Sequence, residues 1–217
     1  MKKLLITMLL PAALAGLMQG AQAQDAKAGE KKIAMCIGCH GIPGYQASFP
    51  EIHKVPMIAG QGSKYIVSAL GAYKKGDRKH PTMRAIAGSL SDRDMADIAA
   101  YYEQQGKLAG EPAPKPAQDA PVQVAELLKK GNCVSCHGDN FSKPIDPTYP
   151  TIGGQHADYL YVALKSYQSK NNPQIGRANP VMGGMAAAFN HKELKLLAQY
   201  IGSLQGELKT VPESHFR

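Results

Sequence analysis

The sequence predicts an all-α fold divided into two tandem domains that arose by duplication. The 217-residue chain matches itself when it is shifted by 94 to 99 residues, and the matched positions keep their order along both halves. Apolar residues recur at three- and four-residue steps, as on a helix with one buried face, and no segment shows convincing strand alternation. A segment rich in proline and alanine lies between the halves. These patterns indicate two helical units joined by an extended connector.

The repeated positions are spread along most of each half. Residues 55–61 read VPMIAGQ and residues 149–155 read YPTIGGQ, with the same proline, isoleucine, glycine and glutamine. Further matches keep the offset of 94 residues: Tyr65, Ala69, Leu70 and Tyr73 correspond to Tyr159, Ala163, Leu164 and Tyr167. Two copies are too few for a solenoid, so the duplication predicts two separate domains.

Residues 1–23 are predicted to be a cleaved secretory signal peptide. Two lysines precede an apolar run at residues 4–18, and Ala21-Gln22-Ala23 has the small-x-small pattern of a cleavage site. A retained membrane anchor is the alternative, but the run is short for a bilayer and contains Pro11 and Gly16. We therefore expect the mature protein to be exported from the cytoplasm.

The mature chain divides at residues 107–121, which form the predicted linker. Its composition of prolines, alanines and charges favours an extended connection with little tendency to pack. The predicted domains are residues 24–106 and residues 122–217. Each is small for a self-sufficient core, so each needs an additional apolar group in its interior.

Three helices are predicted in each half. The first covers residues 26–37 or 122–130, and the second covers residues 63–75 or 157–169. The last helix begins at a capping box, formed by Ser91 with Asp94 in one half and by Asn190 with Glu193 in the other. Its apolar stripe is interpreted as core: Met95, Ile98, Ala99 and Tyr102, or Leu194, Leu197, Ala198 and Ile201.

All four cysteines lie in two copies of one motif. Residues 36–40 read Cys-Ile-Gly-Cys-His, and residues 133–137 read Cys-Val-Ser-Cys-His. Two thiols a helical turn apart can add to the two vinyl groups of one porphyrin, and the following imidazole then reaches the iron. The sequence therefore predicts two covalently bound haem c groups. Their attachment residues are Cys36, Cys39, Cys133 and Cys136, and their proximal iron ligands are His40 and His137.

A zinc site, a redox-active disulfide and a structural disulfide framework are the alternatives for such cysteine pairs. The two pairs begin 97 residues apart, too far for one small zinc knuckle, and each is followed directly by a histidine. Neither lies in the βαβ setting of a thioredoxin-like disulfide. The repeated histidine favours haem over all three.

The ligand opposite each histidine separates an electron carrier from a catalyst. Met83 and Met182 hold matched positions on predicted loops, each two residues after a proline, and would give His/Met ligation with a raised potential. Met185 is an alternative to Met182, and His80 is an alternative ligand for the first haem. No acid, base or arginine recurs around both methionines. A haem enzyme with an open iron is therefore the less favoured interpretation.

A proximal histidine usually donates its other ring nitrogen to a carbonyl that fixes its tautomer. Pro56 and Pro150 are the candidates for this carbonyl, because they match in the repeat and follow each haem motif. The alternative is that both prolines only rigidify a turn.

The formal net charge of +8 could serve nucleic-acid binding or attraction to acidic partners and anionic membranes. No nucleic-acid motif is present, and four haem propionates offset part of the charge. We therefore expect the basic surface to steer the protein to acidic partners or anionic membranes. A basic cluster brackets Met83 and is interpreted as a docking patch or as a solvated helix end: Lys74, Lys75, Arg78, Lys79 and Arg84.

Taken together, these motifs closely resemble the dihaem cytochrome c4 family. Each half has Cys-x-x-Cys-His, a Pro-x-Ile-(Ala/Gly)-Gly-Gln segment, a Pro-x-Met loop and a capped last helix. The resemblance implies two class I cytochrome c domains related by a pseudo-twofold, with neighbouring haem edges. It also implies the iron ligands His40, Met83, His137 and Met182.

The resemblance further implies a periplasmic, non-enzymatic carrier that passes one electron at a time between a bc-type complex and a haem-copper terminal oxidase. Some similar proteins associate peripherally with membranes, and others are subunits or acceptors of periplasmic dehydrogenases, so these partners remain alternatives. The sequence departs from the pattern in two places. The segment His40 to Gly60 is three residues longer than His137 to Gly154, and Met182 is followed by Gly183-Gly184-Met185.

Overall fold

The computed structural model describes residues 24–107 and 119–212. The predicted signal peptide at residues 1–23 and most of the predicted linker lie outside these ranges. Among the described residues, no helix combines the length and apolar character needed to cross a bilayer. The described chain is mostly helical, with a few two-residue strands, and this confirms the all-α prediction.

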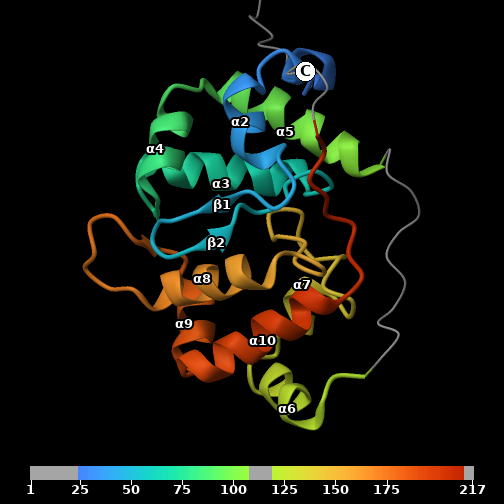
Figure 1. Ribbon diagram of the computed structural model, residues 1–217, viewed down its shortest axis with the longest axis vertical. Helices are drawn as coiled ribbons and strands as arrows, with labels where there is room; N and C mark the ends of the chain where they lie inside the picture. Colours follow the sequence, from blue (N-terminus) through green and yellow to red (C-terminus); the bar gives the residue numbers. More distant parts are fainter. Residues whose placement is uncertain (1–23, 108–118, 213–217) are drawn as a thin grey trace, which may run out of the picture.

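The two halves form two helical domains, one above the other in Figure 1. The first domain contains α1 (Ala26–Glu30), α2 (Ala34–His40), β1 (Gln46–Ala47), β2 (His53–Lys54), α3 (Ser63–Lys75), β3 (Arg78–Lys79), α4 (Pro81–Gly88) and α5 (Asp92–Lys107). The second contains α6 (Val122–Lys130), α7 (Val134–His137), α8 (Ala157–Gln168), β4 (Gly176–Arg177), α9 (Pro180–Ala187) and α10 (His191–Ser203).

The capping boxes are confirmed. At the start of α5, the backbone N–H of Ser91 donates to Asp94 at 3.0 Å, and the N–H of Asp94 donates to the Ser91 hydroxyl at 3.1 Å. Asn190 and Glu193 make the same reciprocal bonds at the start of α10. Both last helices therefore begin where their sequence requires, and the buried apolar stripes behind them form the centres of the two cores.

Two local predictions were wrong. The first helix was expected to run over residues 26–37, but it stops after α1 and resumes as α2, with a turn between them that brings Lys32 to Asp97. The methionine segments were expected to be loops, but they form α4 and α9. Each begins with proline at its first position, where a missing N–H costs nothing, and a capping side chain at His80 or Asn179 accepts from the third residue's N–H.

Helix α1 lies directly against α5 because Gly29 has no side chain. A Cβ at this position would come within 2.1 Å of the carbonyl oxygen of Asp97 and 2.9 Å of the Tyr101 Cβ. The same contact buries Asp97, whose side chain is 1% exposed. Its carboxylate accepts from Lys32 Nζ at 2.9 Å, from Arg93 Nε at 3.0 Å and from the backbone N–H of Asp25 at 3.0 Å.

Replacing Asp97 with asparagine is expected to destabilise the first domain by about 3 kcal/mol, because two cations lose a buried partner. Burial alone would raise the pKa of Asp97, but the bonds from Lys32, the Asp25 N–H and Arg93 lower it to about 2. The contribution of this carboxylate is therefore complete above about pH 4 and is lost as the pH falls toward 2. Denaturant unfolding of both proteins between pH 2 and pH 7 measures it. A difference in the free energy of unfolding between the two proteins that stays constant from pH 2 to pH 7 would contradict this role of the Asp97 carboxylate.

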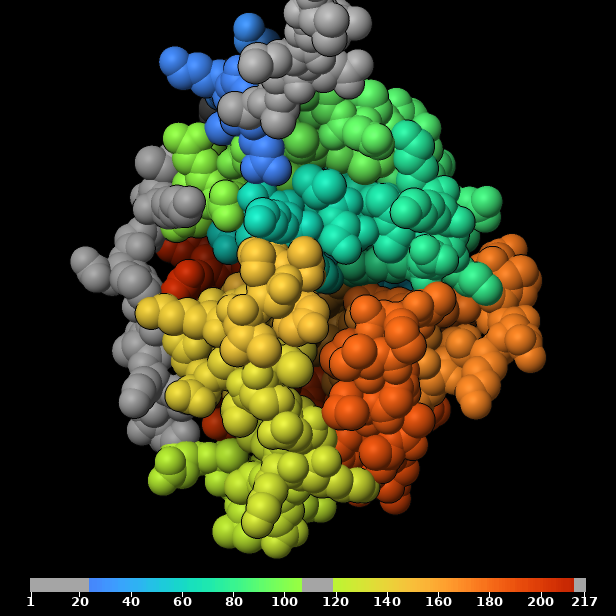
Figure 2. Space-filling view, turned by 180° about the vertical axis from the view of Figure 1, so that it is seen from behind, coloured from blue at the N-terminus to red at the C-terminus, as the bar shows by residue number. Residues whose placement is uncertain are grey.

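The domains meet along a continuous seam, visible in the space-filling view as green and cyan segments above yellow and orange ones (Figure 2). In the ribbon, β1 and β2 lie between α3 and α8 (Figure 1). On this hairpin the Lys54 N–H donates to Asp158 at 3.0 Å, and nearby Glu51 pairs with Lys165 Nζ at 2.6 Å. The C-terminal segment also returns to the first domain, where the Lys209 N–H donates to the Ala59 carbonyl at 3.0 Å.

Candidate haem sites

Each cysteine motif lies on a short helix that ends at its histidine. Cys36 and Cys39 are on α2, which ends at His40. In the second domain Cys133 is the N-cap of α7, Cys136 lies inside it, and the helix ends at His137. Residues three apart share one side of a helix, so each pair of thiols is presented together. None of the four cysteines is in a disulfide, so both pairs are available for thioether links to haem.

Both histidines are held by the predicted carbonyls. His40 Nδ1 lies 2.9 Å from the Pro56 carbonyl oxygen, and His137 Nδ1 lies 3.0 Å from that of Pro150. This confirms the interpretation of the two prolines. Since a carbonyl only accepts, Nδ1 carries the proton, and Nε2 keeps its lone pair for a metal. Burial lowers the pKa of both imidazoles, which favours the neutral form that binds iron.

The two predicted methionines occupy equivalent places. Met83 is the third residue of α4 and Met182 is the third residue of α9. Their backbone N–H groups donate to the capping side chains of His80, at 3.4 Å, and Asn179, at 2.9 Å. Met83 packs against the core of the first domain, and Met182 is partly buried, whereas Met185 is 43% exposed. His80, the alternative ligand, has its Nδ1 committed to this cap.

Two arginines face each other across the domain interface. β3 pairs antiparallel with β4, and Arg78 lies opposite Arg177. Both donate to the Tyr159 hydroxyl, at 2.7 and 3.2 Å, and Arg78 also donates to the Tyr65 hydroxyl at 3.1 Å. Burial opposes ionisation of Tyr159, but the two guanidiniums lower the pKa of its hydroxyl to about 8.

The two facing arginines bring positive charge together at the interface. Among the described residues, no carboxylate forms a salt bridge with Arg78 or Arg177, and Arg78 Nε is buried without a hydrogen-bond acceptor. A cavity of ≈ 30 Å³ beside the two guanidiniums has room for about two water-sized groups. Two half-buried like charges side by side are costly unless an anion accompanies them. The arginine pair therefore fits haem, whose propionates supply negative charge. The thiols and imidazoles fit the vinyl groups and the iron of the same group.

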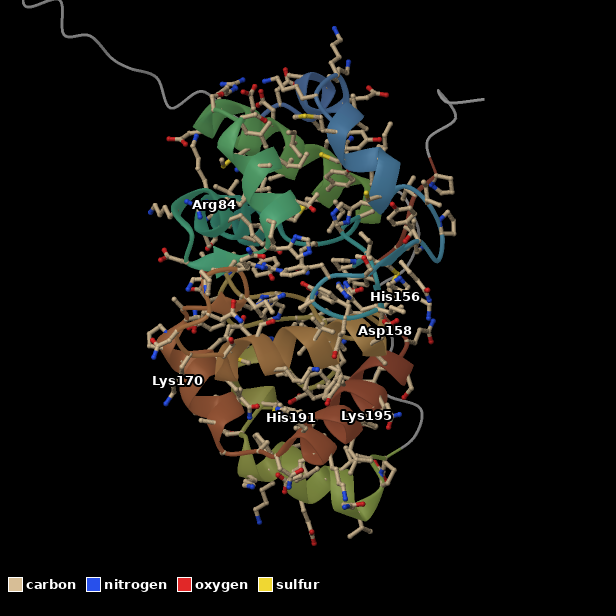
Figure 3. The ribbon with its side chains drawn as sticks, turned by 60° about the vertical axis from the view of Figure 1, so that its left-hand side comes forward. Arg84, His156, Asp158, Lys170, His191 and Lys195 are labelled. Carbon is tan, nitrogen blue, oxygen red and sulfur yellow. The ribbon has the colours of Figure 1, made fainter. Side chains whose placement is uncertain are left out.

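The predicted docking cluster is wrong for two of its members. Arg78 lies in the interface, and Lys79 Nζ donates across it to the Asn172 carbonyl at 2.7 Å. Lys74, Lys75 and Arg84 are all exposed, and Lys74 Nζ donates to the Leu90 carbonyl at 2.6 Å. Arg84 lies at the left edge of the first domain in Figure 3. The basic cluster is thus divided between the interface and the surface, because β3, which carries Arg78 and Lys79, pairs with β4 of the other domain.

A family model described as Cytochrome c matches the chain twice, over residues 26–105 and residues 122–205. Cytochrome c4 of Azotobacter vinelandii is 31% identical over 221 aligned residues, which cover 94% of this chain and 100% of that protein. The chain belongs to the dihaem cytochrome c4 family. The crystal structure of reduced recombinant cytochrome c4 from Pseudomonas stutzeri has a TM-score of 0.60 and 29% identity, covering 84% of this chain and all of that one.

A second type of relative bears a different name. The thiosulfate dehydrogenase electron acceptor of Stutzerimonas stutzeri (strain A1501) is 30% identical, over 89% of this chain and 93% of that protein.

The tandem cytochrome c domains establish two covalent haem c groups and the role of a cytochrome c4-like dihaem electron carrier.

Sequence reasoning missed the residues of the interface. The sequence identified Tyr65 and Tyr159, like Gln61 and Gln155, only as matched positions of the repeat. The matched glutamines were the available signal, since a polar side chain repeated at equivalent positions indicates a polar contact that both halves make.

Proposed function

We propose that this protein is a periplasmic one-electron carrier between a bc-type complex and a haem-copper terminal oxidase. The supporting observation is that the two domains carry equivalent groups: an imidazole bonded to a proline carbonyl, and a methionine at a matched helix start. When bound, each haem supplies one iron that gains and loses a single electron. Two closed sites with similar ligands suit transfer and leave no position for a substrate.

In this proposal His40 and Met83 ligate the first iron, and His137 and Met182 ligate the second. The Pro56 and Pro150 carbonyls hold each imidazole in the tautomer that presents Nε2. Cys36, Cys39, Cys133 and Cys136 form the thioether links. The helix caps at His80 and Asn179 fix the backbone of each methionine, and the partial exposure of Met185 speaks against it as the ligand.

Arg78 and Arg177 are proposed to hold haem propionates at the interface. Replacing Arg177 with glutamine should lower the haem potentials by on the order of 60 mV, because positive charge stabilises the reduced, less positive site. The potential should also become more dependent on pH between 5 and 8, as a propionate without its cation takes up a proton more readily. Potentiometric titration at several pH values measures both effects.

The control for this variant is Arg84→Gln, which removes the same charge from an exposed position. It should leave the potentials nearly unchanged, since solvent screens a surface charge. Equal shifts in the two variants would mean that the interface arginines act only through net charge and hold no propionate.

The second candidate function is electron acceptor of a periplasmic thiosulfate dehydrogenase, suggested by the name of the S. stutzeri relative. Stopped-flow reduction of the purified holoprotein distinguishes the two. A carrier of the respiratory chain should be reduced rapidly by the bc-type complex and oxidised by the oxidase. Reduction by a thiosulfate dehydrogenase at least tenfold faster than by the bc-type complex would favour the second function.

A further inference from the structure

Two glutamines, one from each domain, are buried in the interface and contact the opposite domain. Gln61 is 5% exposed and Gln155 is 3% exposed. They are matched positions of the repeat, each following a glycine that has a positive φ. A buried amide must satisfy both its oxygen and its nitrogen, and each of these does so with backbone atoms of the other domain.

The contacts are reciprocal. Gln61 Oε1 accepts from the Thr151 N–H at 2.9 Å, and Gln61 Nε2 donates to the Thr151 carbonyl at 2.9 Å. Gln155 treats Met57 in the same way, with Oε1 accepting at 3.0 Å and Nε2 donating at 2.8 Å. Each amide thus clamps both polar groups of one residue, as a neighbouring strand would.

The clamped residues are next to the carbonyls that hold the proximal histidines. Thr151 follows Pro150, whose carbonyl accepts from His137, and Met57 follows Pro56, whose carbonyl accepts from His40. Fixing the N–H and C=O of a residue fixes the peptide plane that precedes it, and that plane contains the proline carbonyl. Each glutamine therefore sets the position of an acceptor that lies in the other domain.

We propose that Gln61 and Gln155 are positioning residues for the opposite haem: Gln61, in the first domain, orients the proximal His137 of the second, and Gln155 orients His40. The inference rests on the proposed proximal role of the two histidines. A proximal imidazole that donates a strong hydrogen bond is a more basic ligand and stabilises ferric iron. Loosening the carbonyl weakens this bond and raises the potential of that haem.

The test is a crossed pair of variants, Gln61→Leu and Gln155→Leu, each the matched control of the other. Leucine keeps the side-chain size and removes both hydrogen bonds. In the two-haem protein, Gln61→Leu should raise the potential of the second haem and leave that of the first unchanged. Gln155→Leu should raise the potential of the first haem and leave that of the second unchanged. The NMR signal of each proximal Nδ1–H, assigned to His40 or His137, should move in the same crossed pattern.

Three outcomes would overturn the proposal. The first is a change confined to the haem of the variant's own domain, which would make the glutamine a local packing residue. The second is a fall of both potentials in both variants, because a separated interface admits water to both sites. The third is that no potential and no Nδ1–H signal changes in either variant. If a leucine variant fails to yield folded holoprotein, Gln61→Glu and Gln155→Glu replace it. A carboxylate still accepts from the backbone N–H but cannot donate to the carbonyl. The haem whose proximal Nδ1–H signal changes then shows whether the residue acts on the opposite domain.

Failure of the proposed function would be seen separately. Wild-type protein lacking His/Met spectra, or lacking exchange with respiratory complexes, would refute the carrier assignment while the crossed pattern could still be measured. Conversely, wild-type spectra and electron transfer as expected, with no crossed pattern, would refute only the role of the glutamines.

Discussion

Replacing Met182 with alanine is expected to halve the weak near-infrared charge-transfer band that ligation of ferric iron by sulfur produces. The second iron loses its thioether, while the first keeps Met83. Replacing Met185 should leave the band at full strength, because that side chain is 43% exposed and lies one turn farther along α9. The potential of the second haem should also fall in Met182→Ala, because a thioether ligand favours ferrous iron. Absorption spectra of the oxidised two-haem proteins, scaled per haem, measure the first effect.

Met83→Ala is the matching variant in the first domain and should also leave half of the band. A double variant at Met83 and Met182 should have none. A half-strength band in Met185→Ala, with a full band in Met182→Ala, would reverse the ligand assignment. A wild-type band of only half strength would instead indicate that one iron is open or has a different ligand, and would favour catalysis at that haem.

Replacing Gly29 with valine is expected to destabilise the first domain by about 3 kcal/mol or more, because its Cβ would overlap the Asp97 carbonyl oxygen of α5. The obstruction is backbone and cannot rotate away, so α1 must move off α5. That movement also separates the Asp25 N–H and Lys32 from the Asp97 carboxylate. Denaturant unfolding of the holoprotein followed by far-UV circular dichroism should show a less stable transition for the first domain and an unchanged one for the second.

Gly71→Ala provides the comparison. Gly71 is inside α3, and a Cβ there would meet nothing within 4 Å, so alanine should stabilise the helix by about 0.5–1 kcal/mol. Equal stability of Gly29→Val and the wild-type protein would show that α1 is not held against α5 in solution.

The parts of the fold that could be predicted from sequence are those that depend on local chemistry. Helices at residues 63–75 and 122–130 have the expected ends, and both capping boxes are present, because a cap and an apolar stripe are encoded within a few residues. The carbonyls of Pro56 and Pro150 could be assigned because the duplication marked both at once.

The parts that could not be predicted depend on contacts between the domains. Arg78 and Lys79 look like surface cations in sequence, and only their proximity to Tyr159 and Asn172 shows that they are interface residues. Helices α4 and α9 were missed for a different reason. Both methionine segments were expected to be loops, although a proline at a helix's first position is favourable when a capping residue precedes it.

The paired glutamines and the facing arginines have the geometry of an isologous interface, in which one patch contacts a second copy of itself. The two domains of this chain thus meet as the two subunits of a symmetric homodimer would. Joining them replaces a concentration-dependent association by an intramolecular one, so the interface can form at any dilution with modest affinity of its own. It also frees the two copies to diverge, and the longer segment between His40 and Gly60, which contacts α8, is a difference that a true dimer could not have kept on one side only.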